Sequence, residues 1–256
     1  EVAAGSSEWF ADEARRNVIV ESFAEACRIS AMAIVGGESP SLRYLVKAEP
    51  PVRSAPVFSG CAVGIVAPAK REILPDRLRP DALILGAPSS GIHANGISLI
   101  IQRALPLRGQ FLYQLPNSSQ TVGEAALIPT ANYVPLVEAL LSAEVEILAI
   151  VPVTGDGVAK LLRDPRPFTY RIRSWVKVPP LMQFMLHLGI SLEGCLRTFN
   201  WGIGMFFFVT ESAADRAIEV SKRAGCELVH LGQVEEGARK VIFEPEGGIE
   251  LPPLGA

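Results

Sequence analysis

Apolar residues recur at helical spacing in several segments of the chain. Val20, Phe23, Ala24 and Cys27 occupy positions i, i+3, i+4 and i+7 within residues 12–30, which places them on one face of a helix. The same spacing recurs within residues 97–104, 133–140 and 181–188, and a further helix is predicted over residues 213–223. The chain is therefore expected to contain at least five helices.

Shorter apolar runs between these segments predict strands. They cover residues 31–35, 57–66, 82–85, 147–151, 168–172 and 203–209, with further strands near Leu228 and Val241. Strands and helices alternate without a strict β-α-β rhythm. The pattern therefore favours an α+β fold in which helices cover a mixed sheet.

A charged, proline-bearing segment at residues 68–80 divides the pattern in two. We expect one domain over residues 1–75 and a complete mixed-sheet domain over residues 76–256. The first part offers only two strands and one helix, which would leave an open sheet edge and a thin core. It either takes cover from another chain or lacks sequence upstream.

Composition narrows the classes of function. Hydrophobic residues make up 49% of the chain and charged residues 20%, as in globular proteins. The net charge of −3 gives no electrostatic case for a nucleic-acid partner. The longest apolar runs are too short to span a membrane, and the amino terminus shows no secretory signal.

Basic residues and cysteines complete this picture. Four arginines within residues 163–173 are interrupted by Asp164 and two prolines, which favours a solvated loop and strand face over a polyanion site. The four cysteines are widely spaced in apolar contexts, so we expect buried reduced thiols and a cytoplasmic protein.

The segment 88–96 is the best candidate for binding chemistry. It reads Pro-Ser-Ser-Gly-Ile-His-Ala-Asn-Gly, follows a strand and opens a helix, where free backbone N–H groups can bind an anion. Ser89, Ser90 and Asn95 can add donors, and His93 can donate to a phosphate oxygen. A capped strand-to-helix turn explains the same letters about equally well.

Two glycine turns give further candidates. Thr154, Gly155, Asp156 and Gly157 follow a strand and precede a short helix around residues 158–162; the glycines would admit a phosphate or adenine, and Asp156 could ligate Mg²⁺. A turn that needs positive φ accounts for the same residues. Gly36, Gly37 and Glu38 end a predicted strand, where the carboxylate suits a metal or a ribose, although most such glutamates are solvated.

The segment 199–205 begins the most hydrophobic predicted strand. Asn200 stands at its start, where a polar side chain needs a partner or a ligand. A structural asparagine that satisfies its hydrogen bonds within the strand end is slightly favoured. The chain contains no Walker A sequence, no dinucleotide-binding fingerprint and no zinc-protease motif.

Taken in order, four segments resemble one family. Gly-Gly-Glu-Ser at 36–39, Ser-Ser-Gly-x-His-x-Asn-Gly at 89–96, Thr-Gly-x-Gly at 154–157 and Phe-Asn-x-Gly-Ile-Gly-Met at 199–205 are similar to phosphoribosylformylglycinamidine cyclo-ligase, also called aminoimidazole ribonucleotide (AIR) synthetase. The similarity extends from about residue 1 to residue 244. The segments at 89–96 and 199–205 are its specific parts.

The resemblance implies a two-domain α+β subunit that forms a homodimer and uses ATP and Mg²⁺ to close an imidazole ring on a phosphorylated ribonucleotide. It implies that Ser89, Ser90, Gly91, Asn95 and Gly96 hold the substrate and its phosphate, with His93 and Asn200 as catalytic residues. The resemblance places Gly36, Gly37, Glu38, Thr154, Gly155 and Gly157 beside the nucleotide and the metal.

The chain also departs from the family pattern. The family's Asp-Gly-x-Gly-Thr-Lys and Asn-Asp segments, and the Met-Pro-Gly that usually follows the first glycine pair, do not occur. Pro152 stands where the family usually has His, and Asp156 replaces a glycine. Two alternatives therefore stay open: a non-catalytic, ligand-binding paralogue, or another ATP-using enzyme of this architecture, such as a selenophosphate synthetase, a thiamine-phosphate kinase or a hydrogenase-maturation relative.

Overall fold

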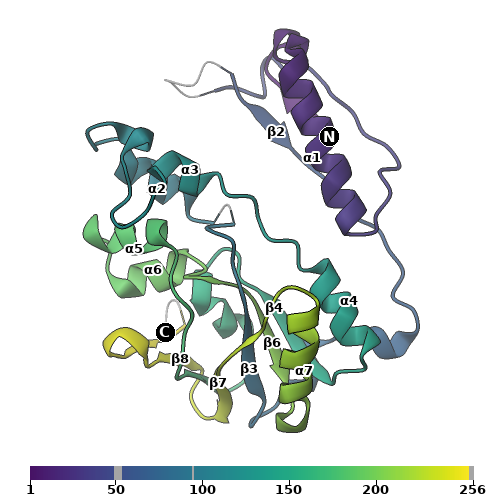
Figure 1. Ribbon diagram of the computed structural model, residues 1–256, viewed down its shortest axis with the longest axis vertical. Coiled ribbons are helices and arrows are strands. Elements are labelled where there is room, and N and C mark those ends of the chain that lie inside the picture. Colours follow the sequence, from purple (N-terminus) through teal and green to yellow (C-terminus); the bar gives the residue numbers. More distant parts are fainter. Residues whose placement is uncertain (49–53, 94, 254–256) are drawn as a thin grey trace. The chain divides into compact units, whose positions relative to one another are not determined.

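A computed structural model describes residues 1–48, 54–93 and 95–253. The chain divides into two compact units, residues 1–70 and residues 71–256. Figure 1 shows a small unit at the amino-terminal end and a larger unit that contains the main sheet.

The first unit consists of a two-stranded sheet and one long helix. Strand β1 (Val2–Ala4) pairs antiparallel with β2 (Pro56–Phe58). Helix α1 (Glu13–Ile29) confirms the helix predicted over 12–30, and the Asp12 side chain caps it by accepting a hydrogen bond from the backbone N–H of Arg15. No residue of α1 is buried, however, so the apolar face that predicted this helix stays largely uncovered.

Two strand predictions in the first unit fail. Residues 31–35 form no strand, and the strand predicted over 57–66 ends at Phe58. Ala31 has a φ of 51°, which breaks the extended conformation at the start of the first segment. Val63 and Ile65 are more than 90% exposed and pair with no described strand. An apolar run becomes a strand only where a neighbouring strand takes its backbone hydrogen bonds.

The second unit is built on a seven-stranded sheet with the order β4-β6-β3-β7-β5-β8-β9. Neighbouring strands run antiparallel except β5 and β8, which are parallel, so the sheet is mixed and the α+β prediction is confirmed. The strands predicted at 168–172 and 203–209 have the observed bounds. The strands are β3 (Leu83–Pro88), β4 (Ile147–Pro152), β5 (Phe168–Ile172), β6 (Ile203–Val209), β7 (Val229–Glu236), β8 (Lys240–Phe243) and β9 (Ile249–Leu251).

Helices cover both faces of this sheet. Along β6, Phe206 and Phe208 enter the larger core cluster while Phe207 enters the smaller one, because successive side chains point to opposite faces. Helices α4 and α7 lie side by side over the smaller cluster (Figure 1). The helices α3 and α6 and strand β9 were not predicted. The helices are α2 (Ile97–Ala104), α3 (Val122–Ala126), α4 (Val134–Ser142), α5 (Pro180–His187), α6 (Leu192–Thr198) and α7 (Glu211–Arg223).

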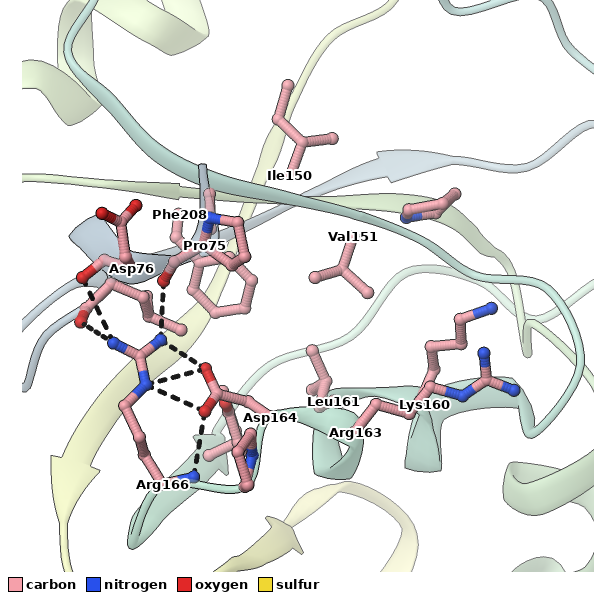
Figure 2. Close-up of a pocket in the computed structure, with 15 residues that line it drawn as sticks. Pro75, Asp76, Ile150, Val151, Lys160, Leu161, Arg163, Asp164, Arg166 and Phe208 are labelled. Carbon is pink, nitrogen blue, oxygen red and sulfur yellow. Dashed lines mark hydrogen bonds and ion pairs between the residues drawn. The ribbon is translucent and has the colours of Figure 1, made fainter. Parts of the chain in front are cut away.

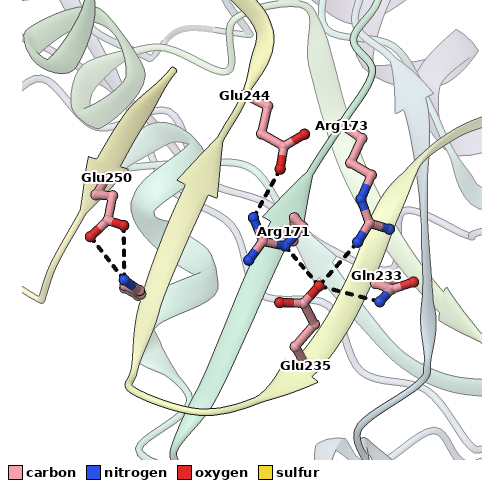
Figure 3. Close-up of polar contacts among 7 residues, drawn as sticks. Arg171, Arg173, Gln233, Glu235, Glu244 and Glu250 are labelled. Carbon is pink, nitrogen blue, oxygen red and sulfur yellow. Dashed lines mark hydrogen bonds and ion pairs between the residues drawn. The ribbon is translucent and has the colours of Figure 1, made fainter.

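Ion pairs join neighbouring strands at the exposed side of the sheet (Figure 3). The Arg171 guanidinium lies 2.7 Å from a carboxylate oxygen of Glu235 and 2.8 Å from one of Glu244. Arg173 contacts the same Glu235 oxygen at 3.1 Å. These hydrogen bonds hold the pKa of Glu235 below its usual value. The other two arginines of the basic segment, Arg163 and Arg166, pair with Asp156 and Asp164, so this segment is a partly exposed face with neutralised charge.

The cysteines are free thiols, as predicted, but only Cys195 is fully buried. Burial raises the pKa of the Cys195 thiol to about 12. The expectation that all four are buried is wrong for the other three: Cys27 and Cys226 are half-buried, and Cys61 is exposed in the first unit, where little core exists to cover it. No helix of the described residues has the length and apolarity needed to cross a membrane.

Candidate functional site

The turn between β3 and α2 is held from two sides. Its first residue, Ser89, donates its backbone N–H to the carbonyl oxygen of Gly202 at 2.8 Å. Its last residue, Gly96, has a φ of 72°, and a Cβ there would lie 2.3 Å from the Phe199 ring. A residue with a side chain would therefore clash as well as strain the backbone. The turn depends on glycine at 96 and on the segment that precedes β6.

Asn200 is the main tie between these two segments. Its side chain is fully buried, and its Nδ2 donates to the carbonyl oxygen of Gly91 at 2.8 Å. Its Oδ1 accepts from the Ser89 hydroxyl and from the Gly202 backbone N–H, both at 3.0 Å. These bonds use three of the four hydrogen-bonding positions of the amide. The geometry makes Asn200 a positioning residue that fixes the shape of the turn.

His93 has one nitrogen engaged and one open. Its Nε2 lies 3.1 Å from the backbone nitrogen of Ser90 and 3.3 Å from that of Ala131, and both N–H groups donate to it. The Ser90 hydroxyl, 3.0 Å from Nε2, donates to the carbonyl oxygen of Pro129. Because Nε2 acts as an acceptor, this network assigns the proton of the neutral ring to Nδ1. Burial lowers the pKa of His93, which also favours the neutral ring.

The Nδ1–H group of His93 makes no hydrogen bond to any described residue. His93 also has a φ of 51°, a conformation that non-glycine residues adopt rarely and often at functional sites. The ring is half-buried. The structure therefore presents a neutral donor, held by the backbone, for an acceptor atom of a ligand.

Two residues beside His93 were not identified from the sequence. A Cβ built on Gly204 would lie 2.0 Å from the Tyr133 hydroxyl and 2.7 Å from His93 Cε1, so a side chain there would clash with both residues. Tyr133 donates its hydroxyl to the carbonyl oxygen of Pro88 at 2.7 Å, and burial raises its pKa. Tyr133 was read only as part of a helix face, and the Phe-Asn-x-Gly-Ile-Gly pattern was the only signal for Gly204.

The turn after β4 adjoins the same region. Asp156 and Gly157 both have positive φ, and a Cβ at Gly157 would lie 2.4 Å from the carbonyl oxygen of Phe199. Gly155 has open space around it. The residues that follow form the 3-10 helix η5 (Gly157–Arg163) where a short helix was predicted. Gly157 therefore packs this turn against the segment that leads to Asn200.

The proposed metal role of Asp156 meets an obstacle. Its carboxylate lies 2.7 Å from the Arg163 guanidinium. The described residues contain no group of three or more histidine, cysteine or acidic side chains placed to hold a metal ion. The described residues of the second unit therefore do not form a complete metal site by themselves. Asp156 can supply at most one carboxylate to an ion whose other ligands come from elsewhere.

Hydrogen bonds join the three turns into one cluster. The Asn95 side chain donates to the carbonyl oxygen of Val153 at 3.2 Å, and the Val153 N–H donates to that of Gly204 at 2.9 Å. Thr154, next along the chain, is in contact with the Lys160 ammonium. We call this the turn cluster; it contains the predicted site residues Ser89, Ser90, Gly91, His93, Asn95, Gly96, Thr154, Gly155, Asp156, Gly157 and Asn200.

The remaining predicted site residues lie in the first unit. No described atom approaches within 4 Å of a Cβ built on Gly36 or Gly37. The carbonyl oxygen of Glu38 accepts a hydrogen bond from the Val2 N–H at 2.9 Å. The segment 36–38 therefore lies beside β1 within the first unit.

Residues 79–244 match the family described as AIR synthase related protein, C-terminal domain. This match covers more than half of the chain. The chain belongs to the AIR synthase-related family. The resemblance inferred from the four ordered motifs is thereby confirmed.

Named relatives and solved structures agree with the AIR synthase-related assignment. The phosphoribosylformylglycinamidine cyclo-ligase of Alkaliphilus oremlandii is 32% identical over 231 residues, covering 88% of this chain and 65% of the relative. The hydrogenase maturation protein HypE in complex with ATP has a TM-score of 0.59 at 18% identity, over 100% of this chain and 73% of HypE. PurL of T. maritima, complexed with FGAR, has a TM-score of 0.53 at 14% identity, over 98% of this chain and 38% of PurL. These two structures share the fold, and the chain spans about 65% of the length of the cyclo-ligase.

Proposed function

We propose that the chain supplies the substrate-binding domain of an ATP-dependent cyclo-ligase that converts formylglycinamidine ribonucleotide to aminoimidazole ribonucleotide. The observation that carries this proposal is the meeting of three glycine-containing turns around buried Asn200. Family membership and relatives named cyclo-ligases at about 30% identity support the reaction class.

The reaction needs a site that orients the substrate and neutralises its developing negative charge. It needs no nucleophilic side chain. Phosphoryl transfer from ATP would activate the formyl-derived amide oxygen, an internal nitrogen would attack that carbon, and phosphate would leave as the ring closes. Such a reaction requires held orientation and donors aimed at developing negative charge. Neutral His93 would donate from Nδ1 to a phosphate or amide oxygen, and Asn200 would keep the turn in place.

The nucleotide and its metal would bind at the turn that follows β4. ATP would lie near Thr154, Gly155 and Gly157. Mg²⁺ would arrive with the ATP phosphates, since Asp156 is already paired with Arg163. The uncovered apolar face of α1 is consistent with a homodimer of cytoplasmic subunits, as the family resemblance implies.

The direct test is formation of aminoimidazole ribonucleotide by the full-length gene product with ATP, Mg²⁺ and K⁺. We expect turnover, and we expect His93→Ala to lower kcat/KM by about 100-fold, because one donor to developing charge is worth about 10²–10³. His187→Ala, on a helix away from the turn cluster, is the matched control and should leave kcat/KM unchanged. An unchanged kcat/KM in His93→Ala would show that His93 takes no part in the reaction.

A ligand-binding paralogue is the second candidate. Pro152 in place of the family histidine and the Asp156–Arg163 ion pair favour it, because both alter the turn that would face the nucleotide. Calorimetry separates the two candidates. Binding of a phosphoribosyl ligand without any binding of ATP would favour the paralogue, and binding of both would favour the enzyme.

A further inference from the structure

A cavity of about 550 Å³ lies beside the turn cluster, wholly within the second unit (Figure 2). Its walls come from β4, β5, β6, η5 and the 3-10 helix η3 (Pro75–Arg77). Cavities of roughly 300–1,000 Å³ are typical of small-molecule sites. None of the residues that line it belongs to the turn 89–96 or to the segment 199–204.

The middle of the cavity is apolar. Val151 and Leu161 point toward each other across it, and Phe208 lies against one end (Figure 2). The rings of Phe208 and Tyr170 form an edge-to-face pair with centroids 6.0 Å apart. Val151 is only partly buried and belongs to β4, which is an edge strand of the sheet. Apolar and aromatic walls that stay open to solvent favour a flat apolar group between them.

One end of the cavity carries positive charge. Lys160 and Arg163 both line it. Burial and the nearby Arg163 charge lower the pKa of Lys160. Asp156 forms an ion pair with Arg163 and also raises the pKa of Lys160 slightly against these effects. An anion placed between Lys160 and Arg163 would stabilise both charged groups.

The opposite end is closed by Arg166, whose donors are already used. Its guanidinium donates to Asp164 and to the carbonyl oxygens of Pro75, Asp76 and Leu78 (Figure 2). Arg166 is therefore a structural link between η3 and the loop after η5. Asp76 lies at the same end with an exposed side chain, and its carboxylate accepts no hydrogen bond from any described residue. It can accept one from a ligand amino or ring N–H group.

We propose that this cavity is a mononucleotide site: a planar heteroaromatic ring lies between Val151 and Leu161, with its phosphate at Lys160 and Arg163. A fatty acid would meet the cations equally well but would place hydrocarbon against the Asp76 carboxylate. A heteroaromatic amine satisfies both ends. Its two cations contact Thr154 and Asp156 of the turn cluster, but none of its walls comes from residues 89–96, and its occupancy can be measured without turnover.

Calorimetry on the full chain with AMP, GMP, adenosine and inorganic phosphate tests the proposal. We expect AMP or GMP to bind at least 10-fold more tightly than adenosine or phosphate, because only the nucleotides engage both the apolar walls and the cations. Lys160→Ala should weaken nucleotide binding about 10-fold and leave adenosine unchanged. Val151→Trp should abolish binding by filling the cavity. Asp156→Gly should strengthen nucleotide binding several-fold by releasing Arg163.

Controls separate this site from the turn at residues 89–96. Lys222→Ala, an exposed lysine on α7, should leave nucleotide affinity unchanged. Ser90→Ala and His93→Ala should also leave it unchanged, even if they abolish ligase activity. Lys160→Glu, at a partly buried position, serves if Val151→Trp fails to fold, and should abolish nucleotide binding. Affinity that is insensitive to Lys160→Glu, or lost in His93→Ala, or equal for nucleotide and free phosphate, would overturn the proposal.

Discussion

The two units bury very different shares of their apolar residues. The second unit has two clusters of buried residues, one on each face of its sheet. In the first unit, α1 buries none of its 17 residues, and Val35 is 97% exposed. The described residues of the first unit therefore have elements of secondary structure but little core.

The difference shows that a helix can have favourable local interactions and still lack the packing that stabilises a fold. The Asp12 cap and the Arg28–Glu25 pair favour α1 locally, but exposed pairs of this kind contribute little. Most helical stability in proteins comes from packing of the apolar face. We infer that the second unit can fold independently, whereas the first needs cover from elsewhere in the assembly, such as a second copy of the chain.

Dividing the chain is the change with the largest expected effect. A fragment of residues 71–256 should keep cooperative thermal unfolding, because its core is complete. A fragment of residues 1–70 should show no cooperative transition by circular dichroism or calorimetry. A cooperative transition in residues 1–70 alone would contradict the comparison.

Removing one ring from each unit measures the same contrast within the intact chain. Phe206→Ala should lower the free energy of unfolding by about 3–5 kcal/mol, since the side chain is fully buried. Phe23→Ala on α1 should cost less than about 1 kcal/mol, because that ring is 46% exposed. Urea unfolding followed by fluorescence gives both values. Equal costs would mean that the α1 face is covered in solution.

Asn200 tests whether the turn cluster belongs to the stable unit. Asn200→Ala leaves the Gly91 carbonyl and the Gly202 N–H without their partner, and should cost about 2–3 kcal/mol. Gln183→Ala, an exposed amide on α5, is the control and should stay within about 0.5 kcal/mol. A cost for Asn200→Ala no greater than that of its control would show that the turns hold their shape without this amide.

Glu235 offers the smallest effect and a dependence on pH. Its pKa is lowered by Arg171, so the carboxylate stabilises the fold above its unfolded pKa of about 4.3, and this contribution is lost as the pH falls through the lower folded value. Glu235→Gln should therefore cost about 1 kcal/mol at pH 7 and nothing near pH 2. Glu25→Gln, on exposed α1, should show a smaller difference. A cost that does not change with pH would exclude the ion pair as its source.

Local pattern predicted elements well where a long run or a clear period was present. The apolar runs at 168–172 and 203–209 became strands with the expected bounds, and α7 extends the predicted helix by two residues. Helix α3 has only five residues, too few to show a period. The parallel pairing of β5 with β8 depends on contacts between distant segments, which no local pattern records.

The same limit applies to the site. Glycine and serine at strand ends indicated the turns, because their backbone requirements are local. Tyr133 and Gly204 were missed because they meet only when α4 and β6 pack around β3. The ion pair of Asp156 with Arg163 was likewise not expected, and it turns a proposed metal ligand into a partner of a cation.

Asn200 makes the shape of the turn cluster inseparable from the integrity of the surrounding fold. A protein that changed this amide to accept a different compound would leave the Gly91 carbonyl and the Gly202 N–H unpaired and would lose stability. Divergence in this lineage should therefore proceed through positions such as Gly155, where a side chain would meet open space, while residue 200 stays the same in descendants with unrelated substrates.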